Sequence, residues 1–433
     1  MGSGTNGILK KEGFFKNLFG NRILKHAATL ISGTVIAQVI LIAVQLIIRR
    51  MYSADDFGAF SLYMSIVGVL VVVVTMRYEL AVVLPKEEKT SVAILVGGIF
   101  ISLIINLIIL VTIYFFQQPI IRMLNFPVEY AHWLYLVPLS TLLFSVYQFF
   151  NYWLTRHSAF KAISLNKMCR RASEGVTQIG AGVAKIQVGL PVGDIVGNSV
   201  NIVSAYFQAA RRGLSFKGQS LSTVTQALKE YNEFPKYQAV PAVLNTLSML
   251  LPVFFLNAFF GVTVTGYFDL SRQILAVPIA FITASLMQVL LKELRDKVVD
   301  KQKITPTILK TALVLTAIIL PFVVIILLWG PQLFSFFFSA VWEESGHYAQ
   351  ILTFAFAIQF VVSPLSICFT VLEKLKTLAA WQIGYFLLVM ALYFFRHLPV
   401  DQFLWIFTAL NLIAYSIYFI LILFNCKKFD RES

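Results

Sequence analysis

The sequence predicts an all-α polytopic membrane protein. We expect about twelve transmembrane helices in two six-helix bundles, related by a pseudo-two-fold axis along the membrane normal, with a central cavity between them. Composition, the pattern of apolar runs and basic loops, and an internal repeat lead to this prediction. The 433 residues are 58% hydrophobic and only 13% charged, against about 25% charged in soluble domains. So few charges exclude a soluble globule, a disordered chain and a secreted disulfide scaffold.

Apolar runs long enough to cross a membrane recur along the chain. A spanning helix needs about 20 mostly apolar residues. The first run is too long for a signal-peptide core and predicts an uncleaved helix. The fifth and sixth are short and rich in Gly and Ser. The predicted spans are 26–48, 58–84, 92–115, 130–153, 172–186, 193–210, 239–260, 267–291, 308–329, 347–372, 378–395 and 402–425.

Basic residues gather in alternate gaps between these runs. With the N-terminus inside, the inside segments hold 28 of the 35 Lys and Arg, the outside segments 4, and the remaining 3 lie in or at the edge of spans. This asymmetry is the positive-inside signal, and it predicts that both termini are cytoplasmic. The net charge of +14 therefore reflects topology, and we expect no nucleic-acid partner.

The same reading divides the chain into five parts. A basic, partly amphipathic N-terminus precedes two bundles, which a polar linker separates, and a short tail follows. The expected ranges are 1–25 for the N-terminus, 26–210 for the first bundle, 211–238 for the cytoplasmic linker, 239–425 for the second bundle and 426–433 for the cytoplasmic tail.

An internal repeat supports the two bundles. The segment Gly58-Ala-Phe-Ser-Leu-Tyr-Met-Ser-Ile66 aligns with Gly266-Tyr-Phe-Asp-Leu-Ser-Arg-Gln-Ile274 at a constant offset of 208, with Gly, Phe, Leu and Ile in common. Both segments begin an even-numbered helix just after an outside turn. Six helices per half give both halves the same orientation, which places the relating axis along the membrane normal.

Sequence motifs for chemistry are absent. Cys169, Cys368 and Cys426 are odd in number, and we expect free thiols. The scattered histidines give no metal-ligand spacing, and there is no phosphate-binding loop. We therefore expect no metal, no cofactor, no ATPase activity and no catalytic residue.

Charges inside the predicted spans are the informative feature, because they usually face a bundle interior or water. Arg77 and Glu79 lie in the second span, and their two-residue spacing in a helix should keep them from pairing. Arg77 either snorkels to the cytoplasmic surface or faces a cavity. Glu79 either pairs with another helix or titrates as an ion-coupling group.

Asp269 and Arg272 share a face of the eighth span. They form either a local ion pair or a cavity cation with a partner that also serves ion coupling. Lys185 and Asp194 flank the turn between the fifth and sixth spans, where we expect interfacial positions.

Polar amides recur in the spans. Gln38 and Gln45 are seven residues apart and fall on one stripe of the first helix. Interhelical hydrogen bonds and a polar-lined cavity explain such residues equally well. The cavity candidates of this kind are Gln38, Gln45, Asn106, Asn151 and Asn245.

Two stretches resemble a known family. The segment Tyr52-Ser-Ala-Asp-Asp-Phe-Gly-Ala-Phe-Ser-Leu-Tyr63 with Arg77-Tyr-Glu-Leu-Ala-Val-Val-Leu-Pro-Lys-Glu-Glu-Lys89, and the segment Gly266–Pro278, resemble the polysaccharide-transporter (Wzx-type O-antigen flippase) branch of the multidrug/oligosaccharidyl-lipid/polysaccharide flippase superfamily. Asp269 is an extra acid in this pattern.

The resemblance implies an inner-membrane bacterial flippase that moves an undecaprenyl-diphosphate-linked oligosaccharide outward by alternating access, for cell-surface polysaccharide biosynthesis. It implies a cationic cavity holding Arg77 and Arg272, membrane lipids as surroundings, and a polysaccharide polymerase and glycosyltransferases as partners. Without an ATPase, H⁺ or Na⁺ coupling through Glu79 or Asp269 stays open. The basic segment 154–171, read as an inside loop with Lys161, Lys167, Arg170 and Arg171, would attract the diphosphate.

Two other transporters and an enzyme remain as alternatives. A cation-coupled multidrug antiporter would favour acids over arginines in its cavity. A lipid II flippase normally has two further C-terminal helices. A membrane glycan polymerase or ligase would need a large outside loop, and the longest outside segments here, 116–129 and 330–346, are short.

Overall fold

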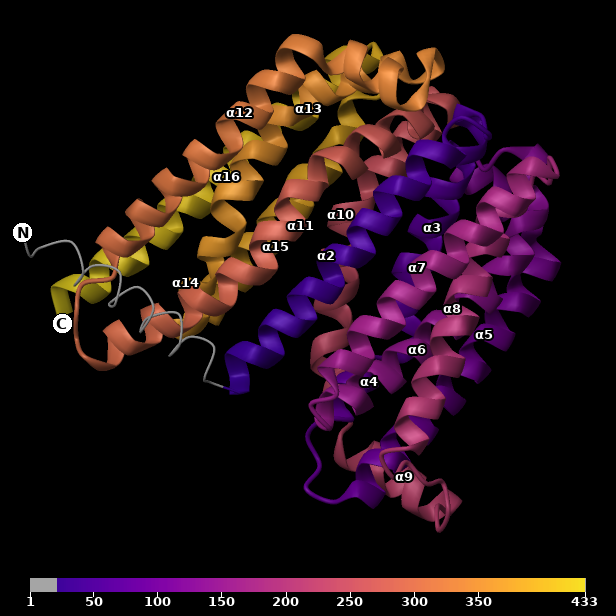
Figure 1. Ribbon diagram of the computed structural model, residues 1–433, viewed down its shortest axis with the longest axis vertical. Helices are drawn as coiled ribbons and strands as arrows, with labels where there is room; N and C mark the ends of the chain where they lie inside the picture. The colour runs from indigo at the N-terminus through magenta and orange to yellow at the C-terminus, as the bar shows by residue number, and fades with distance from the viewer. Residues whose placement is uncertain (1–21, 433) are drawn as a thin grey trace, which may run out of the picture.

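The computed structural model describes residues 22–432, apart from the side chains of 22–32, 34, 280–285, 288 and 375. Most of the predicted N-terminal segment 1–25 lies outside the described residues. Every described regular element is helical, and Figure 1 shows two groups of helices, indigo to magenta and red to yellow, which meet at one end and diverge toward the other. The predicted all-α, two-lobed architecture is confirmed.

The first lobe contains the helices up to residue 210. Their bounds are α2 Arg22–Ile48, α3 Ala54–Thr75, α4 Tyr78–Ala81, α5 Glu88–Leu124, the 3₁₀ segment η1 Val128–Leu136, α6 Val137–Arg156, α7 Phe160–Val183 and α8 Gly189–Ala210. The segment after them contains the short α9 Leu221–Glu230 and one π turn, η2 Phe234–Gln238. The range read as a polar linker is therefore partly helical.

The second lobe repeats this plan. Its elements are α10 Ala239–Phe260, α11 Val262–Val299, α12 Thr305–Phe338, η3 Ala340–Trp342, α13 Glu343–Val362, η4 Ser363–Ser366, α14 Ile367–Val371, α15 Leu375–Met390, η5 Ala391–Phe395 and α16 Val400–Glu432. Each of the twelve predicted spans overlaps a helix, and several of them cover two or three consecutive helical elements. Among the described residues, eight helical stretches are long and apolar enough to cross a membrane, and the described part of α2 gives a shorter apolar stretch.

Two boundaries differ clearly from the prediction. The second span, predicted over 58–84, ends at Thr75, because Met76 and Arg77 both adopt left-handed backbone conformations with φ of 48° and 64°. The fifth helix begins at Phe160, so most of the predicted inside loop 154–171 is part of α7. The loop was predicted wrongly because the first part of α7 is too polar to be recognised as a membrane-spanning segment.

The two lobes share a core at one end and have separate cores at the other. We call the shared end the junction end; it contains the α2–α3 and α10–α11 turns. There one apolar cluster includes Ile48, Phe57, Val253, Phe268 and Trp342 from both lobes. At the opposite, distal end, one cluster surrounds Trp153 in the first lobe and another surrounds Ile422 in the second.

The repeat helices α3 and α11 cross at the junction. A Cβ atom on Gly58 would collide with the carbonyl oxygen of Val262, and one on Gly266 would collide with that of Ala54. Since 58 + 208 = 266 and 54 + 208 = 262, the two contacts are the same contact exchanged between lobes. The glycines of the repeat are therefore required for the close approach of two backbones at the pseudo-two-fold axis.

Candidate functional site

A buried ion pair joins the lobes at the junction end. Arg49, directly after α2, has its Nη2 atom 2.7 Å from Oδ2 of Asp269 on α11, and the two side chains are 0% and 5% exposed. The Arg49 Nε atom also donates to Oε1 of Gln45 at 2.9 Å. Its guanidinium lies 3.5 Å from the ring centre of Phe57 and 4.5 Å from that of Trp342. Stacking between aromatic faces stabilises the cation where water is absent.

Asp269 is saturated by partners from three helices. Besides Arg49, it accepts hydrogen bonds from Ser61 on α3 at 2.9 Å and from Gln273 at 2.8 Å. Arg272 approaches it at 3.7 Å. Because residues three and four apart share a helix face, Asp269, Arg272 and Gln273 point in the same direction. The carboxylate is therefore a bridge between lobes and only weakly a partner of Arg272.

Sequence reasoning placed Arg49 in an outside loop and missed this pair. A signal was available: Asp269 is an acid in a strongly apolar stretch, and such a buried charge requires a cation that its own helix does not fully supply. The expected local pair Asp269–Arg272 exists only as the longer of the two contacts.

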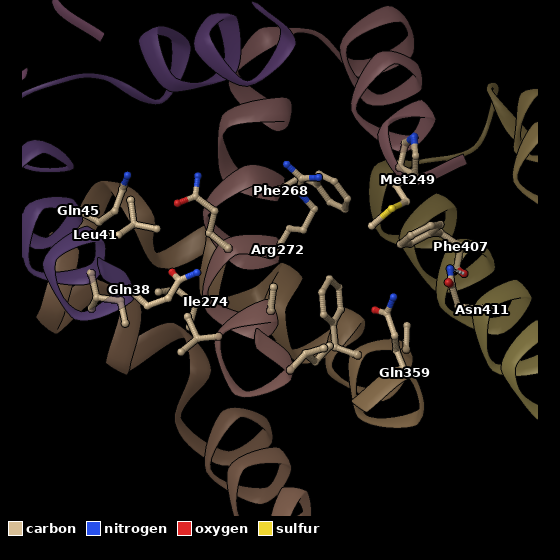
Figure 2. A pocket seen from close by; sticks show the side chains of 18 of the residues that line it. Gln38, Leu41, Gln45, Met249, Phe268, Arg272, Ile274, Gln359, Phe407 and Asn411 are labelled. Atoms are coloured by element: carbon tan, nitrogen blue, oxygen red, sulfur yellow. Dashed lines mark hydrogen bonds between the residues drawn. The ribbon is translucent and has the colours of Figure 1, made fainter. Parts of the chain in front are cut away.

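A cavity of about 460 Å³ lies beside the ion pair. Its wall comes from α2, α10, α11, α13, α15 and α16, so it lies in the second lobe and is closed on one side by α2 of the first. Figure 2 shows Gln38 and Gln45 on one side, Arg272 near the centre, and Gln359 and Asn411 on the other. The sequence predicted Gln38, Gln45 and Arg272 as cavity residues, and the structure brings these three together.

Most of the remaining wall is apolar and aromatic, including Met249, Phe268, Phe356 and Phe407. Arg272 is the cation in this wall, with 31% of its side chain exposed. Two polar pairs were not predicted as sites: Gln359 donates to the hydroxyl of Tyr415, and the hydroxyl of Tyr385 donates to Asn411. The arrangement provides one positive charge, several amides and aromatic faces in one place.

The other predicted amides lie elsewhere. Asn106 is buried between α5 and α6, where it donates to the carbonyl of Ser102 and accepts from Thr141, as the interhelical interpretation expects. Asn151 on α6 is half-buried and Asn245 on α10 is exposed, and neither is among the described residues that line the cavity. Their role as substrate ligands stays a prediction.

Arg77 and Glu79 pair with each other, contrary to the expectation from helical spacing. Their Nη1 and Oε1 atoms are 3.3 Å apart, with Arg77 30% exposed and Glu79 3% exposed. The expectation assumed a continuous helix. The left-handed residues Met76 and Arg77 reverse the chain locally, so residues two apart meet. Oε2 of Glu79 is buried without a hydrogen-bond partner.

Comparison with known proteins identifies the family. The sequence model described as "Polysaccharide biosynthesis protein" matches residues 47–347, which is well over half of the chain. The chain belongs to the polysaccharide biosynthesis protein family. No curated protein matches it.

Solved structures of transporters share the fold of this family member. An inward-facing multidrug resistance MATE family transporter of the MOP superfamily has a TM-score of 0.72 at 15% identity, covering 94% of this chain and 99% of that one. An outward-facing conformation of a multidrug resistance MATE family transporter of this superfamily gives a TM-score of 0.62 at 15% identity, covering 94% of this chain and 96% of that one. A MOP superfamily transporter from Pyrococcus furiosus, described as having a binding pocket of reverse polarity, gives 0.63 at 15%, covering 94% and 96%. The polysaccharide biosynthesis family member is thus a multi-pass membrane protein with a transporter fold.

A second polar cluster of this family member lies inside the first lobe. Arg170 on α7 pairs with Asp194 on α8 at 3.1 Å, and Arg171 pairs with Glu174 at 2.8 Å. Asp194 is 1% exposed, so the expected interfacial position is wrong. It was inferred from closeness to a turn, whereas α8 begins earlier, at Gly189. Arg170 and Arg171 are therefore held by acids and belong to a helix instead of a loop.

Proposed function

We propose that this protein is a flippase that moves a polyprenyl-diphosphate-linked oligosaccharide from the cytoplasmic to the outer leaflet of a bacterial inner membrane. The family and fold support a membrane transporter. The observation that carries the finer proposal is Arg272 in a cavity with Gln38, Gln45 and Gln359. A cation suits a diphosphate, amides suit sugar hydroxyls, and aromatic faces suit the sugar ring or the lipid.

The junction end faces outside in this proposal. The asymmetry of 28 inside and 4 outside basic residues supports cytoplasmic termini and a cytoplasmic distal end. The Arg49–Asp269 pair, with the shared core around it, then holds the lobes together on the outer side. Outward opening requires this pair to separate, and inward opening keeps it, so the pair acts as an outer latch during alternating access.

In this proposal the energy for transport comes from an ion gradient or from a later reaction of the product, and not from a reaction that the chain catalyses. Coupling to H⁺ or Na⁺ through Glu79 or Asp269 remains one option, and consumption of the flipped product by a polymerase is the other. Of the two acids, Glu79 has one unpartnered buried oxygen, whereas Asp269 binds Arg49, Ser61 and Gln273. Glu79 is therefore the better candidate to exchange an ion. We assign no catalytic residue.

Complementation tests the proposal. In a bacterium that lacks its own O-antigen flippase, we expect the chain to restore surface glycan, measured by gel electrophoresis. Arg272→Gln removes the cavity cation and lowers surface glycan at least about tenfold, the factor that corresponds to one charge-assisted hydrogen bond of roughly 1.4 kcal/mol. Arg122→Gln, outside the cavity, is the matched control.

Equal glycan with Arg272→Gln and Arg122→Gln, at equal expression, would remove Arg272 from the substrate path. If the wild-type chain restores no glycan but exports cationic dyes in a gradient-dependent way, the multidrug antiporter replaces the flippase proposal.

A further inference from the structure

A basic pocket lies at the distal end of the second lobe, far along the chain from the cavity residues around Arg272. Its volume is about 380 Å³, and it is formed where the C-terminal part of α16 meets the start of α12. Figure 1 shows the end of yellow α16 beside the start of orange α12 at the same corner of the molecule. The lining residues are Lys303, Thr305, Pro306, Leu309, Lys427, Asp430 and Arg431.

The acid of this pocket, Asp430, is already hydrogen-bonded to the backbone. Asp430 accepts hydrogen bonds from the backbone N–H groups of Ile304 at 2.8 Å and Thr305 at 3.1 Å. These are free N–H groups at the start of α12, and a carboxylate there is stabilised by the helix end. Asp430 therefore fixes the two helix ends together and leaves the nearby cations unpaired.

Three cations of the pocket have no acidic partner. Within residues 22–432, Lys303, Lys427 and Arg431 take part in none of the ion pairs or side-chain hydrogen bonds, and all three are exposed at the pocket. The hydroxyl of Thr305, a lining residue that is 8% exposed, is also buried without a partner. A pocket with three free cations and an unpartnered hydroxyl is suited to an anion with several oxygens.

The start of α5 in the first lobe shows the contrasting case. There Arg156 donates to Glu88 at 3.3 Å and to the carbonyls of Val83 and Pro85. His157 also contacts Glu88 at 3.1 Å. Here the chain supplies an acid and backbone carbonyls to Arg156, whereas the three cations that line the pocket at the start of α12 have no such partners.

An apolar strip continues from the pocket toward the middle of α12. Leu309 lines the pocket and is 46% exposed, and Leu313 and Leu320 follow on the same helix face at 71% and 55%. Positions four and eleven residues apart lie on one face of a helix. A cationic pocket above an apolar strip at a membrane surface matches an anionic headgroup with attached acyl chains.

We propose that this pocket is a binding site for an anionic diacyl phospholipid, with its phosphate at Lys303, Lys427 and Arg431 and its acyl chains along Leu309 and Leu313. The site is separate from the cavity and does not depend on the transported substrate. A bound lipid would bridge α12 and α16 as Asp430 does, and would favour the membrane orientation in which this corner faces the anionic leaflet.

Lipid binding to the detergent-purified full chain tests the site. Native mass spectrometry follows titration with dioleoyl phosphatidylglycerol, dioleoyl phosphatidylcholine or inorganic phosphate. The triple variant Lys303→Gln, Lys427→Gln, Arg431→Gln loses about fivefold in phosphatidylglycerol affinity for each cation removed. The control variant Lys301→Gln, Lys310→Gln, Lys428→Gln removes the same charge from exposed positions that do not line the pocket and keeps wild-type affinity.

Two single variants, Lys427→Gln and Lys428→Gln, repeat the comparison on one helix. They disturb folding less than the triple variants do. The site is supported when only the Lys427 change weakens binding and phosphatidylcholine binds weakly to all variants. It is refuted if both changes act equally, or if phosphatidylcholine binds as well as phosphatidylglycerol. It is also refuted if inorganic phosphate, or a polyprenyl diphosphate, displaces phosphatidylglycerol at equal concentration, because the pocket then recognises a free phosphate or the transported lipid.

Discussion

The helices α3 and α11 occupy equivalent places in the two lobes but differ in where an arginine pairs with an acid. They cross through Gly58 and Gly266 and exchange identical backbone contacts. In α11, Asp269 and Arg272 lie near the crossing, where α3 has Ser61 and Met64 at the corresponding positions. The charges associated with α3, Arg77 and Glu79, follow its last residue at the distal end.

This difference shows which feature the two copies of the repeat share, the close backbone approach, and which they do not, the positions of the charges. The repeat fixes the close backbone approach, which both lobes need equally. The charges break the symmetry: one arginine–acid pair is buried at the junction, and the other joins a partly exposed arginine to a buried acid at a chain reversal. The two lobes thus share a scaffold but differ in charge: a fully buried ion pair lies at the junction end and a partly exposed one at the distal end.

The largest effect should come from breaking the fully buried pair. Asp269→Leu leaves Arg49 buried without its counter-ion, and we expect a loss of about 3–5 kcal/mol in the free energy of unfolding. The double variant Arg49→Leu, Asp269→Leu removes both charges and should recover most of this loss. Tryptophan fluorescence during thermal unfolding in detergent measures both, and Trp342 beside Arg49 reports on the site.

The exposed contact between Asp55 and Thr263, at 2.5 Å across the same two helices, gives the control, since Asp55→Asn should cost little. Equal losses for the single and double variants would show that the destabilisation comes from packing and not from an uncompensated charge.

The second effect tests the crossing itself. Gly58→Ala and Gly266→Ala each insert a Cβ against a backbone carbonyl of the other lobe, which neither helix can avoid without moving apart. Overpacking of this kind costs about 1–3 kcal/mol. Gly384→Ala on α15, where a Cβ would meet nothing within 4 Å, is the matched control. If Gly58→Ala and Gly266→Ala raise the unfolding temperature as Gly384→Ala does, helix propensity, which favours Ala over Gly, decides the result and the crossing does not.

The sequence predicted the fold better than the site, for a physical reason. Apolar length, basic loops and the repeat at Gly58 and Gly266 are properties of many residues, and each tolerates local errors. The ion pair between the lobes depends on Arg49, which follows an apolar run and resembles any basic residue at a helix end. Gln38, Gln45 and Arg272 were found because their polarity is unusual within spans, whereas Tyr385 and Asn411 look ordinary on α15 and α16.

The prediction from helical spacing was wrong where the backbone leaves the helical conformation. Arg77 and Glu79 were kept apart by a rule that holds only for a continuous helix, and no Gly or Pro at 76 or 77 announces the break. Met76 and Arg77 adopt a left-handed conformation that costs ordinary residues about 1–2 kcal/mol each. Tertiary contacts must maintain it, and Tyr78, whose hydroxyl donates to the carbonyl of Leu228, supplies one of them.

The smallest effect tests this chain reversal. Arg77→Gly and Arg77→Ala both remove the ion pair with the buried Glu79, so the loss of this pair is the same in the two variants. They differ in the backbone, because Gly adopts the left-handed conformation without a steric cost. We expect Arg77→Gly to be more stable than Arg77→Ala by about 1 kcal/mol, measured as the difference in unfolding temperature. In a continuous helix the order would be reversed, since Ala is favoured over Gly there by a similar amount. The sign of the difference in stability between Arg77→Gly and Arg77→Ala therefore decides whether the segment after α3 contains a chain reversal or an unbroken helix.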